Sequence, residues 1–292
     1  MKISIVTITH NRAHLIGETI QSILNQTHRD FEHIIIDDGS TDDTQKVVEC
    51  FNDSRIHYFK YPKTEKRSVL RNHGFRRATG ELVAVIDSDD LWVAEKLETM
   101  CTLFKENHGL AFAFHNFDYF PNTNIDTILD RYNADFFRNI LSELLQDKIV
   151  PYATYTIRKA LLDELDLLDE NTTDGQHDLY LRVAAKHEVY YCYQKMSHIR
   201  KHEQNLSLQR YTSHYDNYLY SLQKLFNENA ISASQLQQLQ SNIHKKIAAI
   251  HSANNEYGNA RMHYVKSFRS HFWSRSGFVS FARFLFLTVA KS

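Results

Sequence analysis

The amino-acid sequence predicts an α/β protein with a mostly parallel β-sheet that is covered by helices on both faces. Three observations support this fold class. Short β-branched, apolar segments alternate with segments of helical periodicity through the first 110 residues. The strand-like segments are apolar nearly throughout, as in a sheet that is buried on both faces. Polar or acidic residues directly follow three of these segments, at the strand ends where such sheets bind ligands.

The first 110 residues contain four predicted strands, each followed by a predicted helix. The strands are expected at residues 2–8, 31–37, 55–61 and 81–87, and the helices at residues 14–26, 41–51, 65–78 and 94–107. In the first helix, apolar residues recur at spacings of three and four, which predicts one buried stripe. The second helix is expected to begin at Thr41, because threonine is a favourable N-cap residue and acidic residues follow it.

The pattern is less regular beyond residue 110. The segment "LAFAFHNFDYF" is strand-like, residues 134–146 predict an amphipathic helix, and "YATYTIRKALLDELDLLDE" predicts a strand that runs into a short helix. A helix is predicted at residues 177–187 and a strand at residues 188–195. The last part of the chain has a helical pattern and is rich in Gln, Asn, Ser and Tyr. We therefore expect a first domain at residues 1–208 and a helical C-terminal extension at residues 209–292.

The composition argues against several classes of protein. The formal net charge of −1 gives no overall electrostatic attraction for nucleic acid. The three cysteines, Cys50, Cys101 and Cys192, lie far apart without a CxxC pair, which argues against a disulfide framework or a zinc cluster. No run of 18 apolar residues is present, and the apolar stretch in "MKISIVTITHNR" is too short for a signal peptide. We therefore expect a cytoplasmic protein.

Acidic residues are concentrated directly after the fourth predicted strand, in "IDSDD". Asp87, Asp89 and Asp90 would repel one another and raise one another's pKa unless a positive charge shares the site. Two carboxylates separated by one residue can bind one divalent cation, Mg²⁺ or Mn²⁺, whose other ligands are usually substrate phosphates. A D-x-D triplet alone is a weak signal, and its position at the end of a buried strand gives it weight. The sequence therefore favours a cation and diphosphate site here over a simple turn.

The motifs of the first 120 residues resemble those of one enzyme family. The segments "VTITHNRAHLIGETIQSILNQTHRDFEHIIIDDGSTDDT" and "SVLRNHGFRRATGELVAVIDSDDLW" contain, in order, T-x-N-R, S-I-L-x-Q-T, D-D-G-S, R-N-x-G, A-x-G-E and D-x-D-D. This arrangement closely resembles the family 2 inverting glycosyltransferases with the GT-A fold. The resemblance covers about residues 2–120 and continues more loosely to about residue 208. It implies a metal-dependent transferase that uses a nucleoside-diphosphate sugar, with a UDP-sugar favoured.

The resemblance implies a nucleotide pocket at the first strand ends. Thr9, Asn11 and Arg12 would line this pocket. Asp38 would bind the base of the nucleotide, and Arg71 would approach the base and the ribose. For Arg71, a position on a solvated helix face remains the alternative.

The resemblance also implies a metal and diphosphate site. Asp87 would hold the ribose or a metal-bound water, and Asp89 would coordinate Mn²⁺ or Mg²⁺ on the diphosphate. The segment "HIRKHEQNLS" resembles the R-x-H…S segment that closes over the diphosphate in the family. His202 would then contact the metal or a phosphate, with Arg200 as a charge partner. A structural or surface role for His202 remains open, because the chain contains 17 histidines.

The catalytic base is the least certain part of the expected site. An inverting transfer needs a carboxylate that deprotonates the acceptor hydroxyl. The family usually supplies an acid six residues before the arginine of a D-L-W-L-R-like helix, and here that position holds Gln176, which cannot act as a base. Asp178 and Asp174 are the candidates, with His177 as a third. The alternative for Asp178 is that it only caps the helix.

The C-terminal region has an unusual charge pattern. After Glu256 the sequence contains no Asp or Glu, while basic and aromatic residues accumulate. The segment "GFVSFARFLFLTVA" is too short to span a bilayer and contains Arg283. Residues 261–292 suit the anionic surface of a membrane, and the alternative is that they pack on the catalytic domain or on the second subunit of a homodimer. A peripheral position on the inner face of the cell membrane would fit a lipid-linked acceptor.

We therefore predict a metal-dependent, inverting glycosyltransferase of cell-surface polysaccharide synthesis, of the O-antigen or capsule type. The partners would be a nucleoside-diphosphate sugar as donor and a glycan or lipid-linked acceptor. The alternative is a catalytically impaired nucleotide-sugar-binding or assembly subunit, because Gln176 stands where the family has its base. A nucleotidyltransferase is disfavoured, since "THNRAHL" lacks the glycine-rich, lysine-bearing loop that it would need.

Overall fold

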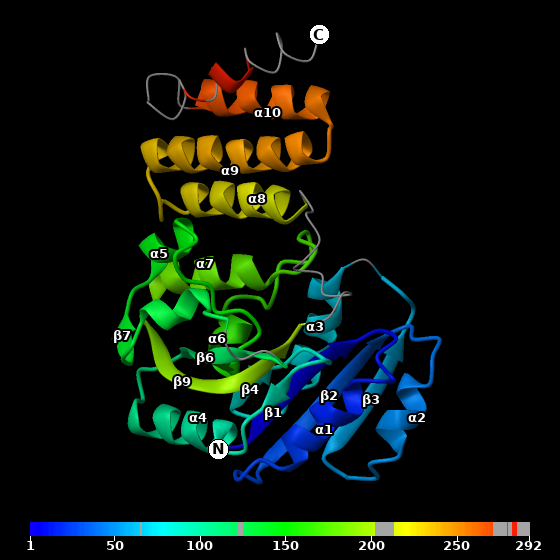
Figure 1. Ribbon diagram of the computed structural model, residues 1–292. Coiled ribbons are helices and arrows are strands. Elements are labelled where there is room, and N and C mark those ends of the chain that lie inside the picture. The colour runs from blue at the N-terminus through cyan, green and yellow to red at the C-terminus, as the bar shows by residue number, and fades with distance from the viewer. Residues whose placement is uncertain (65, 122–124, 202–212, 271–278, 280–281, 285–292) are drawn as a thin grey trace. The chain divides into compact units, whose positions relative to one another are not determined.

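The computed structural model describes residues 1–64, 66–121, 125–201, 213–270, 279 and 282–284. The chain divides into two compact units, Met1–His202 and Glu203–Ser292. The first unit contains a β-sheet with helices, and the described residues of the second unit form helices without strands. Figure 1 shows the elements of each unit.

A mixed β-sheet forms the centre of the first unit. The described residues give nine strands in the order β3-β2-β1-β4-β8-β6-β9-β5, with β7 paired to β9. The strands are β1 (Ile3–Thr9), β2 (Phe31–Asp38), β3 (Ile56–Tyr61), β4 (Leu82–Val85), β5 (Leu91–Trp92), β6 (Phe112–Phe120), β7 (Phe136–Arg138), β8 (Tyr155–Arg158) and β9 (Val189–Arg200). Strands β1 to β4 are parallel, as predicted, and β6 is parallel to β9. Strands β5, β7 and β8 run antiparallel to their neighbours. The α/β class is confirmed.

Helices follow the first four strands in the predicted order. The helices of this unit are α1 (Ile16–Leu24), α2 (Thr44–Glu49), α3 (Arg67–Arg77), α4 (Lys96–Glu106), the 3₁₀ helix η1 (Ile128–Arg131), α5 (Leu141–Leu145), α6 (Lys159–Glu164) and α7 (Gln176–Lys186). Helix α2 begins at Thr44 and not at Thr41, because the N–H of Thr41 donates to the side chain of Asn11 and is held in the preceding loop.

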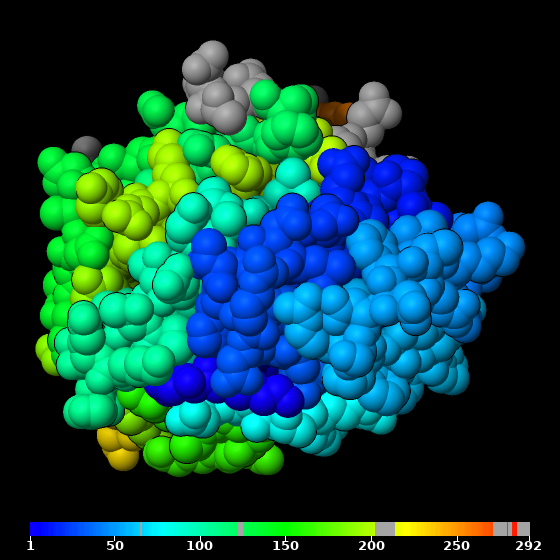
Figure 2. Space-filling view, turned by 90° about the horizontal axis from the view of Figure 1, so that it is seen from below, coloured from blue at the N-terminus to red at the C-terminus, as the bar shows by residue number. Residues whose placement is uncertain are grey.

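The helices cover both faces of the parallel part of the sheet. Ile35 of β2 packs in a cluster with residues of α1 and α2. Its neighbour Ile36 points to the opposite face, as alternation along a strand requires, and lies against Gly74 of α3. A Cβ atom at Gly74 would lie 2.5 Å from a methyl group of Val6, so glycine permits this close packing. In the face shown in Figure 2, the dark blue surface of about the first 30 residues lies between the lighter blue surface around α2 and β3 and the blue-green surface around α4.

The prediction of one helix at residues 134–146 is wrong for the first half of that segment. Residues Phe136–Arg138 form β7, and only Leu141–Leu145 are helical. Strand β7 pairs with β9, and the ring of Phe136 lies 5.0 Å from that of Tyr191. This contact joins residues far apart in the sequence, so the local periodicity could not reveal it.

The second unit consists of helices in its described part, as the sequence predicts. They are α8 (Ser213–Asn227), α9 (Ala233–Ala253) and α10 (Tyr257–Ser270). Ser232 and Gln235 form a capping box that starts α9. Ala248 of α9 packs with Ala260 and Tyr264 of α10, and Phe284 lies against this cluster. No helix in the described part of the chain has the length and the hydropathy of a membrane span.

Lys96, in the first turn of α4, is completely buried. Its Nζ lies 3.5 Å from the centre of the Trp92 ring and has no hydrogen-bond partner among the described residues. Burial lowers the pKa of Lys96 well below its usual value. The unfolded chain therefore binds a proton that the folded protein releases, and this lysine costs stability at neutral pH.

We expect Lys96→Met to raise the free energy of unfolding at pH 7 by about 1–3 kcal/mol, because methionine fills a similar volume without a buried amine. The gain should shrink as the pH approaches about 10, where lysine is neutral in the unfolded chain too. Urea unfolding at pH 7 and pH 10 measures both effects. Lys105→Met, at an exposed position of the same helix, is the control and should change stability by less than about 0.5 kcal/mol. Destabilisation by Lys96→Met at both pH values would contradict the prediction.

Candidate active site

The loop after β1 is fixed to the loop after β2 by hydrogen bonds. Asn11 has a left-handed backbone with φ of +51°. Its N–H donates to Oγ of Ser40 at 2.8 Å, and its Oδ1 accepts the N–H of Thr41 at 2.8 Å. Thr9 at the end of β1 is buried, and its hydroxyl has no partner among the described residues. Arg12 directs its guanidinium toward Asp89, with 3.6 Å between the charged groups. The structure thus brings Thr9, Asn11 and Arg12 to one edge of the sheet.

The two acids at the end of β2 have different partners. Asp37 accepts hydrogen bonds from the N–H of Ser40 and from the hydroxyl of Tyr58, so it holds the loop. Asp38 accepts from Nζ of Lys63 at 2.5 Å and from the N–H of Thr64 at 2.7 Å. The Lys63 side chain is half exposed and can leave this contact, which would make an oxygen of Asp38 available to a ligand.

The acidic turn after β4 concentrates negative charge. Asp87 is 44% exposed, Asp89 is 14% exposed, and Asp90 is buried. Burial, together with repulsion from Asp87 and Asp89, raises the pKa of Asp90 well above its usual value. The Asp90 carboxylate accepts the N–H of Arg200 at 2.9 Å.

This turn fits a cation that takes most of its ligands from elsewhere. Asp87 and Asp89 supply two partly exposed carboxylates one residue apart. The described part of the chain contains no group of three or more His, Cys, Asp or Glu residues that could hold a metal alone. A hard cation here would therefore be completed by phosphate oxygens and water, as is usual for Mg²⁺. His202 lies outside the described residues, so its role as a metal contact stays a prediction.

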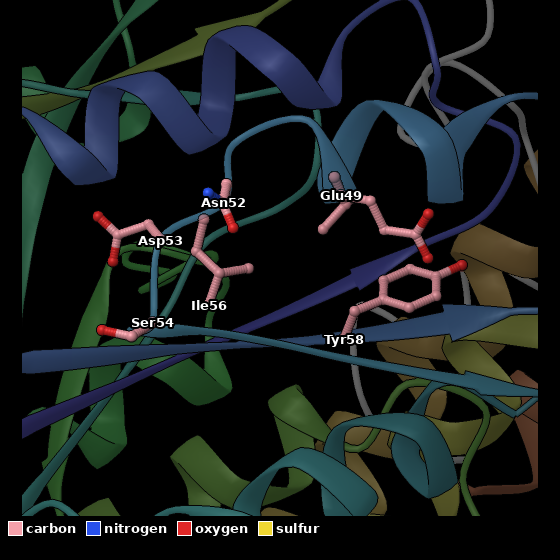
Figure 3. A pocket seen from close by; sticks show the side chains of 7 residues that line it. Glu49, Asn52, Asp53, Ser54, Ile56 and Tyr58 are labelled. Atoms are coloured by element: carbon pink, nitrogen blue, oxygen red, sulfur yellow. The ribbon is translucent and has the colours of Figure 1, made fainter.

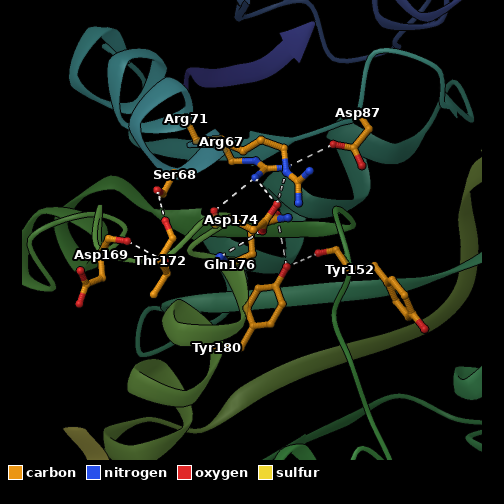
Figure 4. A network of polar contacts seen from close by, with 10 residues as sticks. All are labelled: Arg67, Ser68, Arg71, Asp87, Tyr152, Asp169, Thr172, Asp174, Gln176 and Tyr180. Carbon is orange, nitrogen blue, oxygen red and sulfur yellow. Dashed lines mark hydrogen bonds and ion pairs between the residues drawn. The ribbon is translucent and has the colours of Figure 1, made fainter. Parts of the chain in front are cut away.

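Arg71 links the acidic turn to the start of α7 (Figure 4). Its side chain is 3% exposed, with one terminal nitrogen 2.8 Å from Oδ2 of Asp174 and the other 3.4 Å from Oδ1 of Asp87. Arg67, one helical turn earlier on α3, places Nε 2.9 Å from the same Asp174 oxygen. Burial disfavours the charged form of Asp174, but Arg71 and Arg67 outweigh this effect and hold its pKa well below the usual range. Asp174 is therefore ionised between two guanidinium groups.

Helix α3 also fixes the chain that leads to Asp174. The Ser68 hydroxyl donates to the carbonyl of Thr172 at 2.6 Å, and Asn72 exchanges two hydrogen bonds with the backbone of Leu168. Gly175 has φ of +80°, and a Cβ atom there would lie 2.8 Å from the side chain of Leu168. Only glycine fits this position without displacing its neighbours.

The two candidate bases occupy different environments. Asp178 is 2% exposed and pairs with Arg182 at 2.7 Å, and Arg182 also donates to the carbonyls of Leu165 and Leu167. Asp178 therefore holds Arg182 in the position from which it binds the loop before α7. Asp174 is 30% exposed and lies with Arg71 and Asp87. Of the two residues, the structure brings only Asp174 to the acidic edge.

The comparisons with known proteins identify the family of the chain. A family model described as glycosyl transferase family 2 matches residues 4–166, which is more than half of the chain. The chain belongs to glycosyltransferase family 2. A Rickettsia felis protein named as an uncharacterized glycosyltransferase is 32% identical over 203 residues, which cover 68% of this chain and 33% of that protein. The chain thus spans about a third of the length of that relative.

Two other similar proteins have more specific names. The Escherichia coli protein WfgD, named UDP-Glc:alpha-D-GlcNAc-diphosphoundecaprenol beta-1,3-glucosyltransferase, is 33% identical over 123 residues, or 42% of this chain and 48% of that protein. The crystal structure of residues 1–349 of S. aureus TarS superposes with a TM-score of 0.71 at 17% identity, covering 92% of this chain and 81% of that chain. TarS has also been solved in complex with UDP-GlcNAc. The structural likeness confirms the GT-A type of fold.

Arg67 is a further residue of this candidate site, and the sequence prediction missed it. The available signal was its spacing of four residues from Arg71, which places both guanidinium groups on one face of a helix. Arg200, expected as a charge partner, contacts the acidic turn: its Nε donates to the carbonyl of Asp89 at 3.0 Å and its NH2 to Glu18 at 2.6 Å.

A separate hollow lies away from these residues, at α2 and β3 (Figure 3). Its volume is about 320 Å³, and it is lined by Val48, Glu49, Asn52, Asp53, Ser54, Ile56 and Tyr58. The aliphatic part of the wall comes from Val48 and Ile56. None of the expected nucleotide, metal or catalytic residues lines this hollow, so it is not the expected donor site.

Proposed function

We propose that this family 2 protein is a metal-dependent, inverting glycosyltransferase that moves a sugar from a nucleoside-diphosphate sugar to a glycan or lipid-linked acceptor in cell-surface polysaccharide synthesis. The observation that carries the proposal is the bridge made by Arg71. One buried guanidinium joins Asp87, at the acidic turn, to Asp174, at the start of α7. A donor-binding residue and a carboxylate suited to activate an acceptor thus face the same space.

The nucleotide would bind along the ends of β1, β2 and β4. The proposed contacts are Thr9, Asn11, Arg12, Asp38, Arg71 and Asp87. Two observations support this assignment. The buried Thr9 hydroxyl has no hydrogen-bond partner among the described residues, and Lys63, which pairs with Asp38, is half exposed. A UDP-sugar is favoured because the name of the E. coli relative contains UDP-Glc and TarS has been solved with UDP-GlcNAc. The name of the same relative supports a lipid diphosphate as the carrier of the acceptor.

Asp89 and Asp87, with His202, would hold Mn²⁺ or Mg²⁺ against the diphosphate of the donor. When bound, the cation would neutralise the charge of the leaving nucleoside diphosphate. Arg12, 3.6 Å from Asp89, would hold that carboxylate in place. Asp174 would accept the proton of the acceptor hydroxyl, since it is partly exposed at the acidic edge, whereas Asp178 is enclosed with Arg182.

We propose further that catalysis belongs to residues 1–208 and that residues 209–292 are a helical extension. Contact of residues 261–292 with the inner face of the cell membrane would bring the site to a lipid-linked acceptor. Helix α10 packs through Ala260 and Tyr264 against α9, while Lys266 and Arg269 are exposed and available to anionic lipid or to a second subunit.

A second candidate function is a nucleotide-sugar-binding subunit without catalysis, which Gln176 favours. Two measurements test both functions. The first is thermal unfolding in the presence of UDP-, GDP- or dTDP-sugars, with Mn²⁺ or with EDTA, and the second is release of the nucleoside diphosphate from the same donors. We expect a UDP-sugar at about 100 times its Kd to stabilise the protein by about 2.7 kcal/mol when Mn²⁺ is present, and UDP to be released. Stabilisation without UDP release, even with a panel of acceptors, would favour the binding subunit. No stabilisation by any of these donors would contradict both functions.

A further inference from the structure

Tyr152 occupies a backbone conformation that is unfavourable for a bulky residue. The N–H and the hydroxyl of Thr154 donate to the carbonyl of Pro151 at 3.3 and 2.6 Å, which closes a turn with Tyr152 and Ala153 at its centre. Tyr152 has φ of +51°, and Ala153 is not among the residues with positive φ. Positive φ at the first central position alone is typical of a type II′ turn, where glycine dominates. A tyrosine there indicates a functional constraint.

The surrounding residues hold Tyr152 in this conformation. The hydroxyl of Tyr180, from α7, donates to the carbonyl of Tyr152. The ring of Phe117, which is buried, packs edge-on against the Tyr152 ring at 5.2 Å. Tyr152 as a whole residue nevertheless remains 36% exposed. Its aromatic ring thus contacts Phe117 while part of the residue stays accessible to a ligand.

Tyr152 lies beside the proposed catalytic edge. The Tyr180 hydroxyl that holds it is 3.4 Å from Oε1 of Gln176, and the N–H of Gln176 donates to Oδ1 of Asp174 at 3.3 Å. Figure 4 shows the Tyr152 ring next to this network and directed away from the guanidinium groups. The other exposed large aromatic residues of the described chain lie in regular strands or helices: Phe137, Tyr193 and Tyr220.

We propose that Tyr152 binds the acceptor by stacking against one face of its pyranose ring. The inference rests on the proposed function, since it names the acceptor side of that same site. The C–H bonds on one face of a pyranose carry weak positive charge, which suits the negative face of an aromatic ring. A ring that is already fixed by Phe117 and by its own backbone loses little conformational freedom on binding. Tyr152 thereby favours acceptors whose pyranose ring presents such a face.

The test observes the tyrosine ring directly in the full chain. Ring-labelled tyrosine gives an NMR signal that Tyr152→Phe assigns, and diamagnetic Mg²⁺ with UDP occupies the donor side. We expect at least one methyl glycoside of glucose, galactose, mannose or N-acetylglucosamine to shift the Tyr152 signal at up to about 100 mM, and the Tyr193 signal to stay constant. An unmoved Tyr152 signal with every glycoside overturns the proposal.

Two variants separate binding from structure. Asparagine tolerates positive φ, so Tyr152→Asn should keep the melting temperature of the parent while weakening glycoside binding about tenfold or more. Tyr152→Phe keeps the ring and should bind within about threefold of the parent. A lower melting temperature of Tyr152→Asn with unchanged glycoside binding would show a structural tyrosine and overturn the proposal. UDP binding is measured separately: its absence counts against the proposed function, and its presence with an unmoved Tyr152 signal counts against this inference alone.

Discussion

Replacement of Asp89 by asparagine is expected to abolish sugar transfer and to leave the fold intact. Asp89 is partly exposed, and the guanidinium of Arg12 lies 3.6 Å from its carboxylate. The amide keeps the size of the side chain but removes the charge that a divalent cation requires. We expect the transfer rate at saturating donor to fall about 10²–10³-fold or more, because the leaving diphosphate loses its neutralising cation. Initial rates of UDP release measure this effect, and calorimetric titration of Mn²⁺ in the presence of UDP measures the loss of the metal.

The control for this variant is Asp163→Asn. Asp163 is an exposed acid on α6 that pairs with Lys159 of the same helix, far in sequence from the acidic turn. Its removal should leave both the rate and Mn²⁺ binding unchanged, since exposed pairs of this kind contribute little. Full activity of Asp89→Asn would show that the metal assignment is wrong.

Asp174→Asn is expected to reduce kcat about 10²–10⁴-fold and also to lower the free energy of unfolding, because the buried Arg71 keeps only Asp87 as a charged partner. Asparagine still accepts hydrogen bonds from Arg71 and Arg67 through its amide oxygen, but it cannot take a proton from the acceptor. Transfer rates at saturating donor and acceptor are compared with the affinity for UDP. A lower rate with unchanged UDP affinity indicates loss of the catalytic base, and a lower UDP affinity indicates a disturbed nucleotide pocket. Parent-like kcat would remove Asp174 from the mechanism.

Two companion variants sharpen this result. Gln176→Asp places an acid where the family usually has its base, and partial recovery of transfer in the double variant with Asp174→Asn would show that both positions reach the acceptor.

Asp178→Asn should instead lower the free energy of unfolding by about 3–5 kcal/mol, because it leaves the guanidinium of Arg182 without its buried partner. If Asp178→Asn keeps its stability and loses transfer, Asp178 and not Asp174 is the base.

The part of the fold that the sequence predicted well is the part that local patterns determine. Strands β1, β2 and β4 are buried on both faces, as the apolar runs expected of a parallel sheet predict, whereas β3 at the sheet edge is only partly buried. The prediction was wrong where distant contacts decide the structure. Strand β7 exists because Phe136 packs on Tyr191, and β9 extends to Arg200 because it pairs along the length of β6. Neither contact can be predicted from the local sequence, because each joins residues that are far apart along the chain.

The candidate site divides in the same way. The acidic residues of the turn after β4 lie within one short segment, so the sequence alone was enough to predict them as a site. The sequence could not distinguish Asp174 from Asp178, because both residues are aspartates and lie only four positions apart. Their different burial distinguishes them in the structure. The 2% exposure of Asp178 and its pair with Arg182 come from the packing of α7. The pairing of Arg67 and Arg71 with Asp174 crosses more than 100 residues and was invisible to sequence patterns.

The long separation between Arg71 and Asp174 also affects how the protein matures during synthesis. Arg71 emerges from the ribosome with α3, while its carboxylate partner follows 103 residues later. Until then the buried guanidinium could pair only with Asp87, and an incompletely paired buried charge disfavours the compact state. If the proposed site is correct, we expect the buried pairing of Arg71 to be completed only after the segment that carries Asp174 has been synthesised.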